Sequence, residues 1–337
     1  MPPSTIAVIL AAGKGTRMKS EQTKILHPVF FRPMIHHVLD AVRDTGVVQC
    51  AVIIGHQRSE VAMALASYQV TLVTQEEQLG TGHAVLCAEE VCRNHDEVLI
   101  LCGDTPLLGA TTLQKMISVH RSQGADLTLM TTIVDNPFGY GRIVKDAEGN
   151  IQAIVEEKDA TAEQRQIREI NAGVYLVERE FLFNALQEVG TDNAQGEVYL
   201  TDIVAQARRQ KKRVQPFMHD RAIDVLGVNS RVELAQAQAA LQQRRNRELM
   251  LGGVTLESPA TIVVSADCTI GPDCHLQGNV RLSDGTILGR GCLIEAGCVL
   301  KRCRLGNGVT VGANSVLTNC RLDDNSQVEP LTLCNNK

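Results

Sequence analysis

The chain has 337 residues, of which 44% are hydrophobic and 21% charged, which suits a globular protein with one large domain and a smaller one. Its net charge of -5 argues against a nucleic-acid partner, which usually needs a basic face. The apolar run at residues 6–12 is too short to span a membrane and lacks a basic leader. The 11 cysteines include no CxxC pair, which favours reduced thiols over disulfides or a zinc site. We therefore expect a cytoplasmic protein without a membrane partner.

Strand-like and helix-like segments alternate through the first two thirds of the chain. The expected strands are short and rich in Val, Ile and Leu, as buried parallel strands are: residues 6–10, 51–55, 70–74, 98–102 and 127–133. Longer segments of mixed polarity between them, such as residues 34–45 and 111–123, predict helices. This order predicts an α/β, Rossmann-like domain whose mostly parallel sheet has helices on both faces.

Residues 231–251 contain no Gly or Pro and are rich in Ala, Gln, Leu and Arg, so they predict one long helix. Gly252 and Gly253 would end it. We expect this helix to link two different architectures. The predicted organisation is an α/β domain over residues 1–229, a linker helix over 230–253 and a repeat domain over 254–337.

The last segment is periodic. Aliphatic residues recur at six-residue spacing with two one-residue slips: Val264, Ile270, Leu276, Leu282, Leu288, Ile294, Leu300, then Leu305, Val311, Leu317, then Leu322 and Val328. Gly follows several of these anchors, which is typical of the hexapeptide repeat of a parallel β-helix. Three hexads form one triangular coil, so the repeat predicts about four coils.

Six cysteines occupy one column of this repeat, two residues before an anchor: Cys268, Cys274, Cys292, Cys298, Cys303 and Cys320. The other residues in the column are mostly Val, Thr or Ser, so we expect an inward-packing column at the coil corner. A metal-binding ladder is the alternative. It is disfavoured because cysteine behaves as a small buried hydrophobe and no histidine shares the column.

The strongest functional motif is the string LAAGKGTRM at residues 10–18, directly after the first expected strand. A Gly-rich turn at the carboxyl end of such a strand exposes backbone N–H groups to phosphate oxygens. Lys14, Arg17, Lys19 and Lys24 add enough positive charge for a triphosphate. The spacing matches neither a Walker A motif nor GxGxxG. An ordinary tight turn with solvated charges is the alternative interpretation.

The full string resembles the signature of sugar nucleotidyltransferases. Further segments resemble, in order, those of the bifunctional N-acetylglucosamine-1-phosphate uridylyltransferase / glucosamine-1-phosphate acetyltransferase (GlmU) family: Gln75, QLGTGHA at 78–84, GDTPL at 103–107, GYGRI at 139–143, IVEEKDA at 154–160, EINAG at 169–173, NAQGE at 193–197 and GVN at 227–229. The hexapeptide tail agrees with this family, whose β-helix is left-handed and trimeric.

The resemblance implies a UTP-dependent nucleotidyltransferase with the substrates UTP and N-acetylglucosamine-1-phosphate. A phosphate oxygen of the sugar would attack the α-phosphorus of UTP in line, assisted by Mg²⁺, and pyrophosphate would leave. The product, UDP-N-acetylglucosamine, would feed peptidoglycan and lipopolysaccharide precursor synthesis. We expect a homotrimer without acetyltransferase activity, because the family's acetyltransferase site lies in later coils than those present here.

Residue roles follow from the same resemblance. Asp104 and Asn229 match the metal-binding positions, and a carboxylate with an amide oxygen suits Mg²⁺. From its sequence context alone, Asp104 could equally be a helix N-cap. Arg17, Lys24 and Asp104 are the expected catalytic residues, with Arg17 on the leaving pyrophosphate and Lys24 near the α-phosphate.

The expected substrate-binding residues fall into two groups. The nucleotide group is Leu10, Ala11, Ala12, Gly13, Lys24, Gln75, Gly80, Thr81, Cys102, Gly103, Asp104 and Asn229. Gln75 could pair with both a donor and an acceptor on uracil. The sugar group is Gly141, Glu156 and Asn171. A solvated surface position is the alternative interpretation for four of these side chains: Gln75, Glu156, Arg17 and Lys24. Glu197 and Tyr199 lie in a matching motif, but we assign them no role.

Two residues depart from the family pattern. Thr23 stands where a proline usually precedes the lysine, which changes loop rigidity more than chemistry. Cys102 stands where an aromatic residue commonly precedes the Gly-Asp pair, so a packing contact near the nucleotide is in doubt. Three other functions stay open: transfer to another sugar such as glucose-1-phosphate, a non-catalytic assembly or regulatory module, and a β-helix acyltransferase.

Overall fold

The computed structural model describes residues 3–13, 15–55 and 57–336. The chain divides into two compact units, Met1–Leu234 and Ala235–Lys337. The division lies within helix α8 (Arg231–Leu251), whose bounds agree with the predicted helix. The domain limits predicted at 229 and 253 stay a prediction. No helix in the described ranges is both long and apolar enough to cross a membrane.

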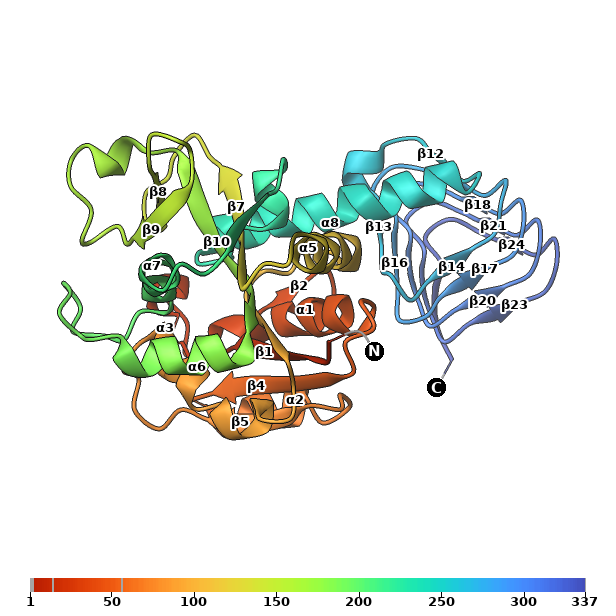
Figure 1. The fold of residues 1–337 in the computed structure, drawn as a ribbon. Coiled ribbons are helices and arrows are strands. Elements are labelled where there is room, and N and C mark those ends of the chain that lie inside the picture. Colours follow the sequence, from red (N-terminus) through yellow and green to blue (C-terminus); the bar gives the residue numbers. More distant parts are fainter. Residues whose placement is uncertain (1–2, 14, 56, 337) are drawn as a thin grey trace. The chain divides into compact units, whose positions relative to one another are not determined.

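The first unit is built on a nine-stranded sheet, several strands of which are labelled in Figure 1. Seven of its strands follow the order β11-β7-β10-β6-β1-β4-β5. These seven are β1 (Thr5–Leu10), β4 (Gln49–Ile54), β5 (Thr71–Thr74), β6 (Glu97–Cys102), β7 (Leu127–Ile133), β10 (Glu169–Glu178) and β11 (Val214–Met218). The pairs β1·β4, β1·β6, β4·β5 and β7·β11 are parallel, as expected. The exception is β10, which is antiparallel to both neighbours.

Antiparallel additions complete this unit. Strands β8 (Arg142–Lys145) and β9 (Ile151–Val155) form a hairpin that pairs with β10. Strands β2 (Pro28–Val29) and β3 (Arg32–Pro33) form a separate small hairpin. These strands were not predicted, because their apolar runs are short or interrupted by charge. The hairpin of β8 and β9 carries one side of the candidate site described below.

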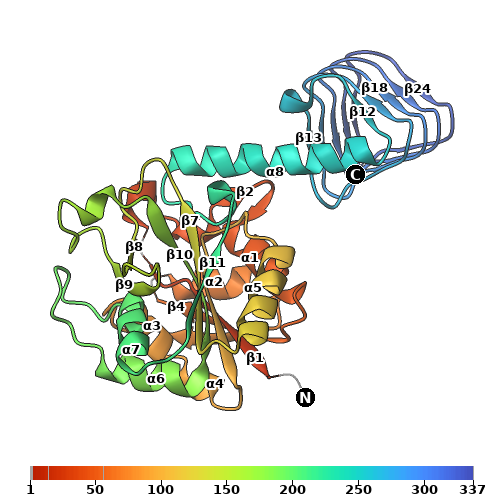
Figure 2. The same ribbon diagram turned by 45° about the horizontal axis from the view of Figure 1, so that its top comes forward.

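Helices cover both faces of the sheet, as the alternation predicted (Figure 2). Ile6 and Val8 of β1 belong to one buried cluster, and Ala7 and Ile9 belong to the other. The first cluster contains residues of α3 (Thr81–Leu86), α4 (Glu89–Cys92), α6 (Arg179–Glu188) and α7 (Ile203–Arg209). The second contains α1 (Met34–Arg43), α2 (Arg58–Ala64) and α5 (Ala110–Gln123). The alternating side chains of a strand explain why both faces are apolar.

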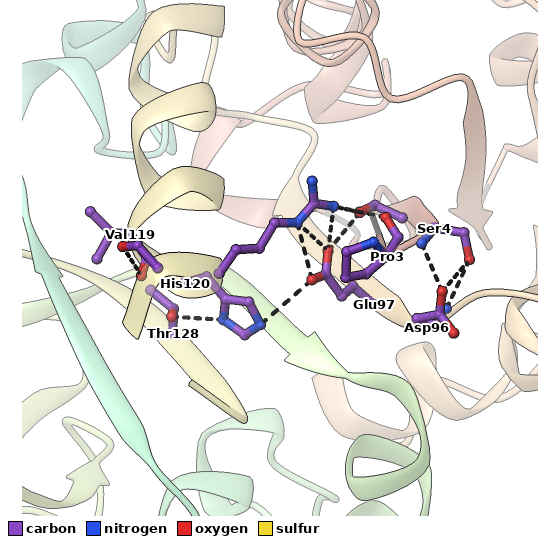
Figure 3. Close-up of polar contacts among 10 residues, drawn as sticks. Pro3, Ser4, Asp96, Glu97, Val119, His120 and Thr128 are labelled. Atoms are coloured by element: carbon purple, nitrogen blue, oxygen red, sulfur yellow. Dashed lines mark hydrogen bonds and ion pairs between the residues drawn. The ribbon is translucent and has the colours of Figure 1, made fainter. Parts of the chain in front are cut away.

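The amino end of β6 is closed by a polar group that we call the amino-edge cluster: Thr5, Glu97, His120, Arg121 and Thr128. The Glu97 carboxylate accepts hydrogen bonds from Arg121 Nη2 at 2.7 Å and Thr5 Oγ1 at 2.8 Å. Its other oxygen lies 4.0 Å from His120 Nε2, and His120 Nδ1 is bonded to Thr128 Oγ1 at 2.8 Å (Figure 3). Both oxygens of the buried Glu97 carboxylate therefore have polar partners within the protein.

The second unit is a parallel β-helix, consistent with the predicted left-handed type. Its strands form three sheets: β12-β15-β18-β21-β24, β13-β16-β19-β22-β25 and β14-β17-β20-β23. The bounds are β12 Thr255–Leu256, β13 Val263–Val264, β14 Thr269–Ile270, β15 His275–Leu276, β16 Arg281–Ser283, β17 Ile287–Leu288, β18 Leu293–Ile294, β19 Val299–Lys301, β20 Arg304–Leu305, β21 Thr310–Val311, β22 Val316–Thr318, β23 Arg321–Leu322, β24 Gln327–Val328 and β25 Leu333–Asn335. Every predicted anchor lies in one of these strands, so the repeat phase is confirmed.

The two phase slips have a local cause. Most turns between anchors contain a residue of positive φ three positions after the anchor, such as Asp273 with φ 61°. At the slips this residue comes one position earlier, at Arg302 with φ 53° and Asn319 with φ 55°. The corner is therefore closed by a chain one residue shorter, and the next strand starts early.

The cysteine column packs inward as predicted. The thiols of Cys274, Cys292 and Cys298 donate to carbonyl oxygens of the next coil, at Gly289, Gly306 and Gly312, over 3.0, 3.1 and 3.2 Å. All six cysteines of the column are buried. A side chain of this size fills the corner without displacing the neighbouring coil and still satisfies its S–H group.

Candidate active site

Most of the predicted nucleotide-binding residues meet at the carboxyl ends of β1 and β6. They line a pocket of about 260 Å³: Leu10, Ala11, Ala12, Gly13, Lys24, Gln75, Gly80, Thr81, Cys102 and Asp104, together with Ile25, Gln78, Ala84 and Glu197. Backbone bonds hold the two strand ends together, since Gly103 N donates to Leu10 O over 2.9 Å. The carboxyl edge of a parallel sheet is the usual ligand position in such folds.

A larger groove of about 860 Å³ lies at the opposite edge, beside the amino ends of β4 and β5. Its lining includes Arg32, Asp40 and Tyr68 but none of the predicted site residues. These three groups already bond to one another, with Arg32 Nη1 2.6 Å from Asp40 Oδ2 and Arg32 Nη2 2.6 Å from Tyr68 Oη. Size alone therefore does not identify the site.

The Gly-rich turn brings its backbone close to Lys24. Gly15 has φ 62°, and a Cβ there would lie 2.6 Å from Lys24 Cβ, so glycine is required by both conformation and space. Gly13 is exposed with open space beside it, which leaves room for a ligand to approach the backbone. Met18 anchors the turn in the core, while Arg17 is exposed and lies near Gly139. Lys14, predicted to add charge here, lies outside the described residues.

Three predicted residues converge on one point beside this turn. The Lys24 ammonium donates to Asp104 Oδ2 and, over 3.0 Å, to Asn229 Oδ1. Lys24 and Asp104 are mostly buried, and they are 80 residues apart in sequence. The alternative that Asp104 is a helix N-cap does not hold, because the structure describes no helix that starts at its side chain. Lys24 therefore contacts both predicted metal ligands.

The GVN segment is shaped to hold Asn229 against Asp104. Val228 N donates to Asp104 O over 2.9 Å, and a Cβ at Gly227 would lie 3.1 Å from both carboxylate oxygens. Asn229 Nδ2 donates to Gly227 O, which turns Oδ1 toward Lys24. Glu233 Oε2 also accepts from the Asn229 N–H over 2.6 Å.

This last contact belongs to a helix-start motif that was not predicted from the sequence. Glu233 N donates to Ser230 Oγ, and the carboxylate of Glu233 reaches back to the chain just before the helix. This is the pattern of a capping box, S-x-x-E, which is readable from sequence as Ser230 to Glu233. The start of α8 thus positions Asn229.

The donor set at this point fits a hard divalent cation. The Asp104 carboxylate and the Asn229 amide oxygen both face the position of the Lys24 ammonium, so this position already suits a positive charge. Gly227 has no Cβ, which leaves space beside the carboxylate. No group of three or more His, Cys, Asp or Glu suited to a metal occurs in the described part of the chain. Two protein oxygens alone do not complete a coordination shell, so phosphate oxygens and water would supply the remainder.

Gln75 is held differently from the expectation. Its Nε2 donates to Gly80 O and interacts with His83 Nδ1, both over 3.1 Å, and the side chain is buried. The amide nitrogen is therefore committed within the protein, and the Oε1 atom is the group available to a base. Gln78, which was not assigned a role, donates to Ala12 O over 2.7 Å and braces the Gly-rich turn.

The predicted sugar-binding residues form a second group on β8, β9 and β10. Asn171 N donates to Gly141 O over 2.9 Å, and a Cβ at Gly141 would lie 3.5 Å from Glu156 Oε1. A bulge in β10 between Asn171 and Tyr175, where Gly173 has φ 72°, turns the chain at this point. These residues were expected to lie together only from the family resemblance.

Two further side chains orient this group. Thr201 Oγ1 donates to Glu156 Oε1 over 3.1 Å, and Asn171 Nδ2 donates to Tyr175 Oη over 2.6 Å. Burial raises the pKa of Glu156, and the Thr201 hydrogen bond opposes that shift. Thr201 and Tyr175 are buried residues outside the quoted motifs, so no sequence signal separated them from the core.

The NAQGE segment and Tyr199, left without a role, form a support for both groups. Val198 exchanges two 2.8 Å backbone hydrogen bonds with the loop that precedes and starts α3, at Leu79 and Gly82. Tyr199 Oη bonds to Asp159 Oδ2 over 3.2 Å. The segment therefore ties the nucleotide-side loop to the strand region that holds Glu156.

Cys102 lies between the two groups. Its Sγ donates to Gly173 O over 3.7 Å, and a Cβ at Gly173 would lie 3.1 Å from the sulfur. Burial raises the pKa of this thiol to about 12, so it is a packing group and not a nucleophile at neutral pH. A small residue at 102 fits the close approach of β10.

Comparison with known proteins agrees with this geometry. Residues 7–173 match the model of the MobA-like NTP transferase domain, and residues 267–302 and 285–319 match that of the bacterial transferase hexapeptide. The fold resembles a putative glucose-1-phosphate thymidylyltransferase from Bacillus anthracis, with a TM-score of 0.57 and 21% identity over 70% of this chain and 94% of that one. At this identity the likeness concerns the fold alone.

Curated relatives are more similar. The bifunctional protein GlmU of Desulfotalea psychrophila is 53% identical over 264 residues, which cover 78% of each chain. The GlmU proteins of Geotalea daltonii and Geobacter metallireducens are 46% and 47% identical over 78% of this chain, but the matches span only 60% and 56% of their length. The chain belongs to the family of the bifunctional protein GlmU, and its larger unit is that family's nucleotidyltransferase domain.

Proposed function

We propose that the chain is an N-acetylglucosamine-1-phosphate uridylyltransferase. A phosphate oxygen of the sugar phosphate forms a bond to the α-phosphorus of UTP while the bond to the bridging oxygen of the β-phosphate breaks. The products are UDP-N-acetylglucosamine and pyrophosphate. The observation that carries the proposal is the meeting of Lys24, Asp104 and Asn229 beside a pocket lined by the Gly-rich turn.

The reaction needs alignment and charge neutralisation more than a nucleophilic side chain. The exposed backbone of the turn would bind phosphate oxygens through its N–H groups. Lys24 would contact the α-phosphate region, because its ammonium lies at the pocket beside that turn. Arg17 is exposed and without a hydrogen bond among the described residues, so it is available for the leaving pyrophosphate.

Asp104 and Asn229 would hold Mg²⁺, which when bound neutralises phosphate charge during the transfer. For this, Lys24 must leave the two oxygens that it contacts and turn to the phosphate. Lys24 and a bound cation would therefore compete for the same two oxygens, those of Asp104 and Asn229.

The sugar side fits a polar ligand with an amide group. Glu156 supplies an acceptor for a hydroxyl, and Asn171 supplies an amide that Tyr175 orients. The cell-wall pathway, the homotrimer and the cytoplasmic location stay predictions from the family resemblance.

The test is pyrophosphate release from UTP and Mg²⁺ with N-acetylglucosamine-1-phosphate, glucosamine-1-phosphate or glucose-1-phosphate. We expect release with the N-acetylated sugar only, and its loss in Asp104→Ala. Preference for glucose-1-phosphate would replace the proposed substrate with another sugar phosphate. No release with any sugar would overturn the enzymatic function and favour an assembly or regulatory module.

A further inference from the structure

The side chain of Gln75 is held by two acceptors at once. It follows β5 and is buried, and its Nε2 lies 3.1 Å from both Gly80 O and His83 Nδ1. A primary amide carries two N–H donors on its nitrogen and an acceptor on its oxygen. Both donors of Gln75 are therefore used by the protein.

His83 has the protonation pattern that this contact requires. Because Gln75 Nε2 is a donor only, Nδ1 of His83 accepts the hydrogen bond and the ring proton lies on Nε2. The ring sits in the first turn of α3, between Gly82 and Ala84, which are both buried. The helix therefore fixes the position of the ring relative to Gln75.

The Gly80 carbonyl by itself would hold the Gln75 amide less firmly than Gly80 and His83 do together. Its carbonyl also accepts from Ala84 N, over 3.1 Å, as the first bond of α3. Gly80 O is thus shared between a helix N–H and Gln75, while His83 Nδ1 holds the second amide hydrogen. In the reversed amide, Oε1 would face the Gly80 carbonyl oxygen, which can only accept, so that contact would be repulsive. The contact with His83 would then require the ring proton to move from Nε2 to Nδ1.

We propose that His83 is a positioning residue for base specificity: it fixes the Gln75 amide so that Oε1 alone is presented to the pyrimidine. The inference rests on the proposed uridylyltransferase function. An acceptor in this position pairs with the N3–H of uracil. It repels the unprotonated N3 of cytosine, so the pair selects UTP over CTP. Discrimination of this kind arises because a mismatched base leaves a buried acceptor unpaired.

The experiment compares kcat/KM for UTP and CTP at saturating N-acetylglucosamine-1-phosphate, together with UTP and CTP binding by calorimetry. The variants are His83→Ala, His83→Asn and, as a matched control, His36→Ala. Asn carries Oδ1 where His carries Nδ1, so it retains the acceptor. His36 is a half-buried helix histidine whose ring bonds to Ala64 O, and it lines the groove at the opposite edge of the sheet.

We expect His83→Ala to lower the UTP-to-CTP ratio by roughly tenfold, the usual effect of one lost hydrogen bond. The change should appear in KM for UTP, with kcat little altered. His83→Asn should restore most of the ratio, and His36→Ala should leave it unchanged.

Two results overturn the inference while the proposed function stands. One is an unchanged ratio in His83→Ala, and the other is an equal loss in His83→Asn and His83→Ala. If the wild-type chain neither binds UTP nor releases pyrophosphate, the proposed function fails instead. The two failures are therefore distinguished by the wild-type arm.

Discussion

The two ends of strand β6 each carry a carboxylate paired with a cation, and the pairs differ in how fully they are satisfied. At the amino end, Glu97 is bonded to Arg121 and Thr5. His120 lies beside Glu97 (Figure 3). At the carboxyl end, Lys24 is the only described side chain that hydrogen-bonds to the Asp104 carboxylate. A fully satisfied pair holds the fold together, whereas a carboxylate with unused lone pairs can receive a ligand.

The comparison predicts opposite effects of removing each carboxylate charge. Asp104→Asn should lower pyrophosphate release by roughly 10³-fold, because the site loses the carboxylate charge of one of the two groups proposed to hold Mg²⁺. Its free energy of unfolding in urea should change little, since the remaining ammonium of Lys24 can still reach Asn229. A variant that keeps a tenth of the activity would contradict the role of Asp104.

Lys24→Gln sharpens the same comparison from the cation side. We expect pyrophosphate release to fall roughly 10²-fold, because one positive group at the transferred phosphate is lost. Binding of Mn²⁺ without nucleotide should become tighter, because an ammonium no longer competes for Asp104 and Asn229. Electron paramagnetic resonance titration measures this binding. Weaker Mn²⁺ binding than in the wild type would show that Lys24 does not take the cation's place.

Glu97→Gln should act on stability alone. It leaves Arg121 without its carboxylate, and we expect a loss of roughly 2–3 kcal/mol in the free energy of unfolding. Urea unfolding measures the loss. Because the amino-edge cluster lies at the other end of β6 from the site, kcat and KM of the folded variant should match the wild type. A change in KM would mean that the two ends of the strand are coupled.

Tyr175→Phe tests a positioning contact on the sugar side. Removal of the hydroxyl frees the Asn171 amide, and one neutral hydrogen bond corresponds to roughly a threefold to tenfold effect. We expect this increase in KM for the sugar phosphate, with KM for UTP unchanged. Equal changes for both substrates would indicate a general packing defect. Phe183→Leu, a buried aromatic change on α6, is the control for such a defect.

The smallest expected effect concerns pH. Burial lowers the pKa of His120 from its ordinary value of 6.5, although the nearby Glu97 opposes the shift. Between these two pKa values, His120 is protonated in the unfolded chain and neutral in the folded chain. The free energy of unfolding therefore falls as the pH drops through 6.5 toward the folded pKa. Thermal unfolding between pH 8 and pH 5 should show a shallower loss in His120→Asn. An identical slope would exclude His120 as a contributor.

The periodic parts of the chain were the most predictable. The hexad spacing identified the β-helix strands and the inward cysteine column, because each repeat is a local unit that stacks on identical neighbours. The five predicted strands of the first unit were also found within one or two residues. Antiparallel β10 and its hairpin were missed, because a strand inserted between β6 and β7 leaves no mark in local sequence.

The candidate site also has a part that the sequence predicted and a part that it did not. The Gly-rich turn and the family motifs selected the candidate site residues, and the structure brings Gly141, Glu156 and Asn171 together. It also changes one expectation, since the amide nitrogen of Gln75 is held by Gly80 and His83 and is not open to uracil. The supporting residues Thr201 and Tyr175 had no signal beyond that of ordinary core residues.

The sequence by itself determined the order of the two architectures, the phase of the repeat and the place of the Gly-rich turn after β1. These depend on short-range patterns of side-chain size, polarity and glycine. Only the tertiary structure decided that Lys24 meets Asn229 across 205 residues and that each end of β6 has a different degree of polar satisfaction. Such contacts depend on which strands pair and how closely they approach, and no local pattern specifies them.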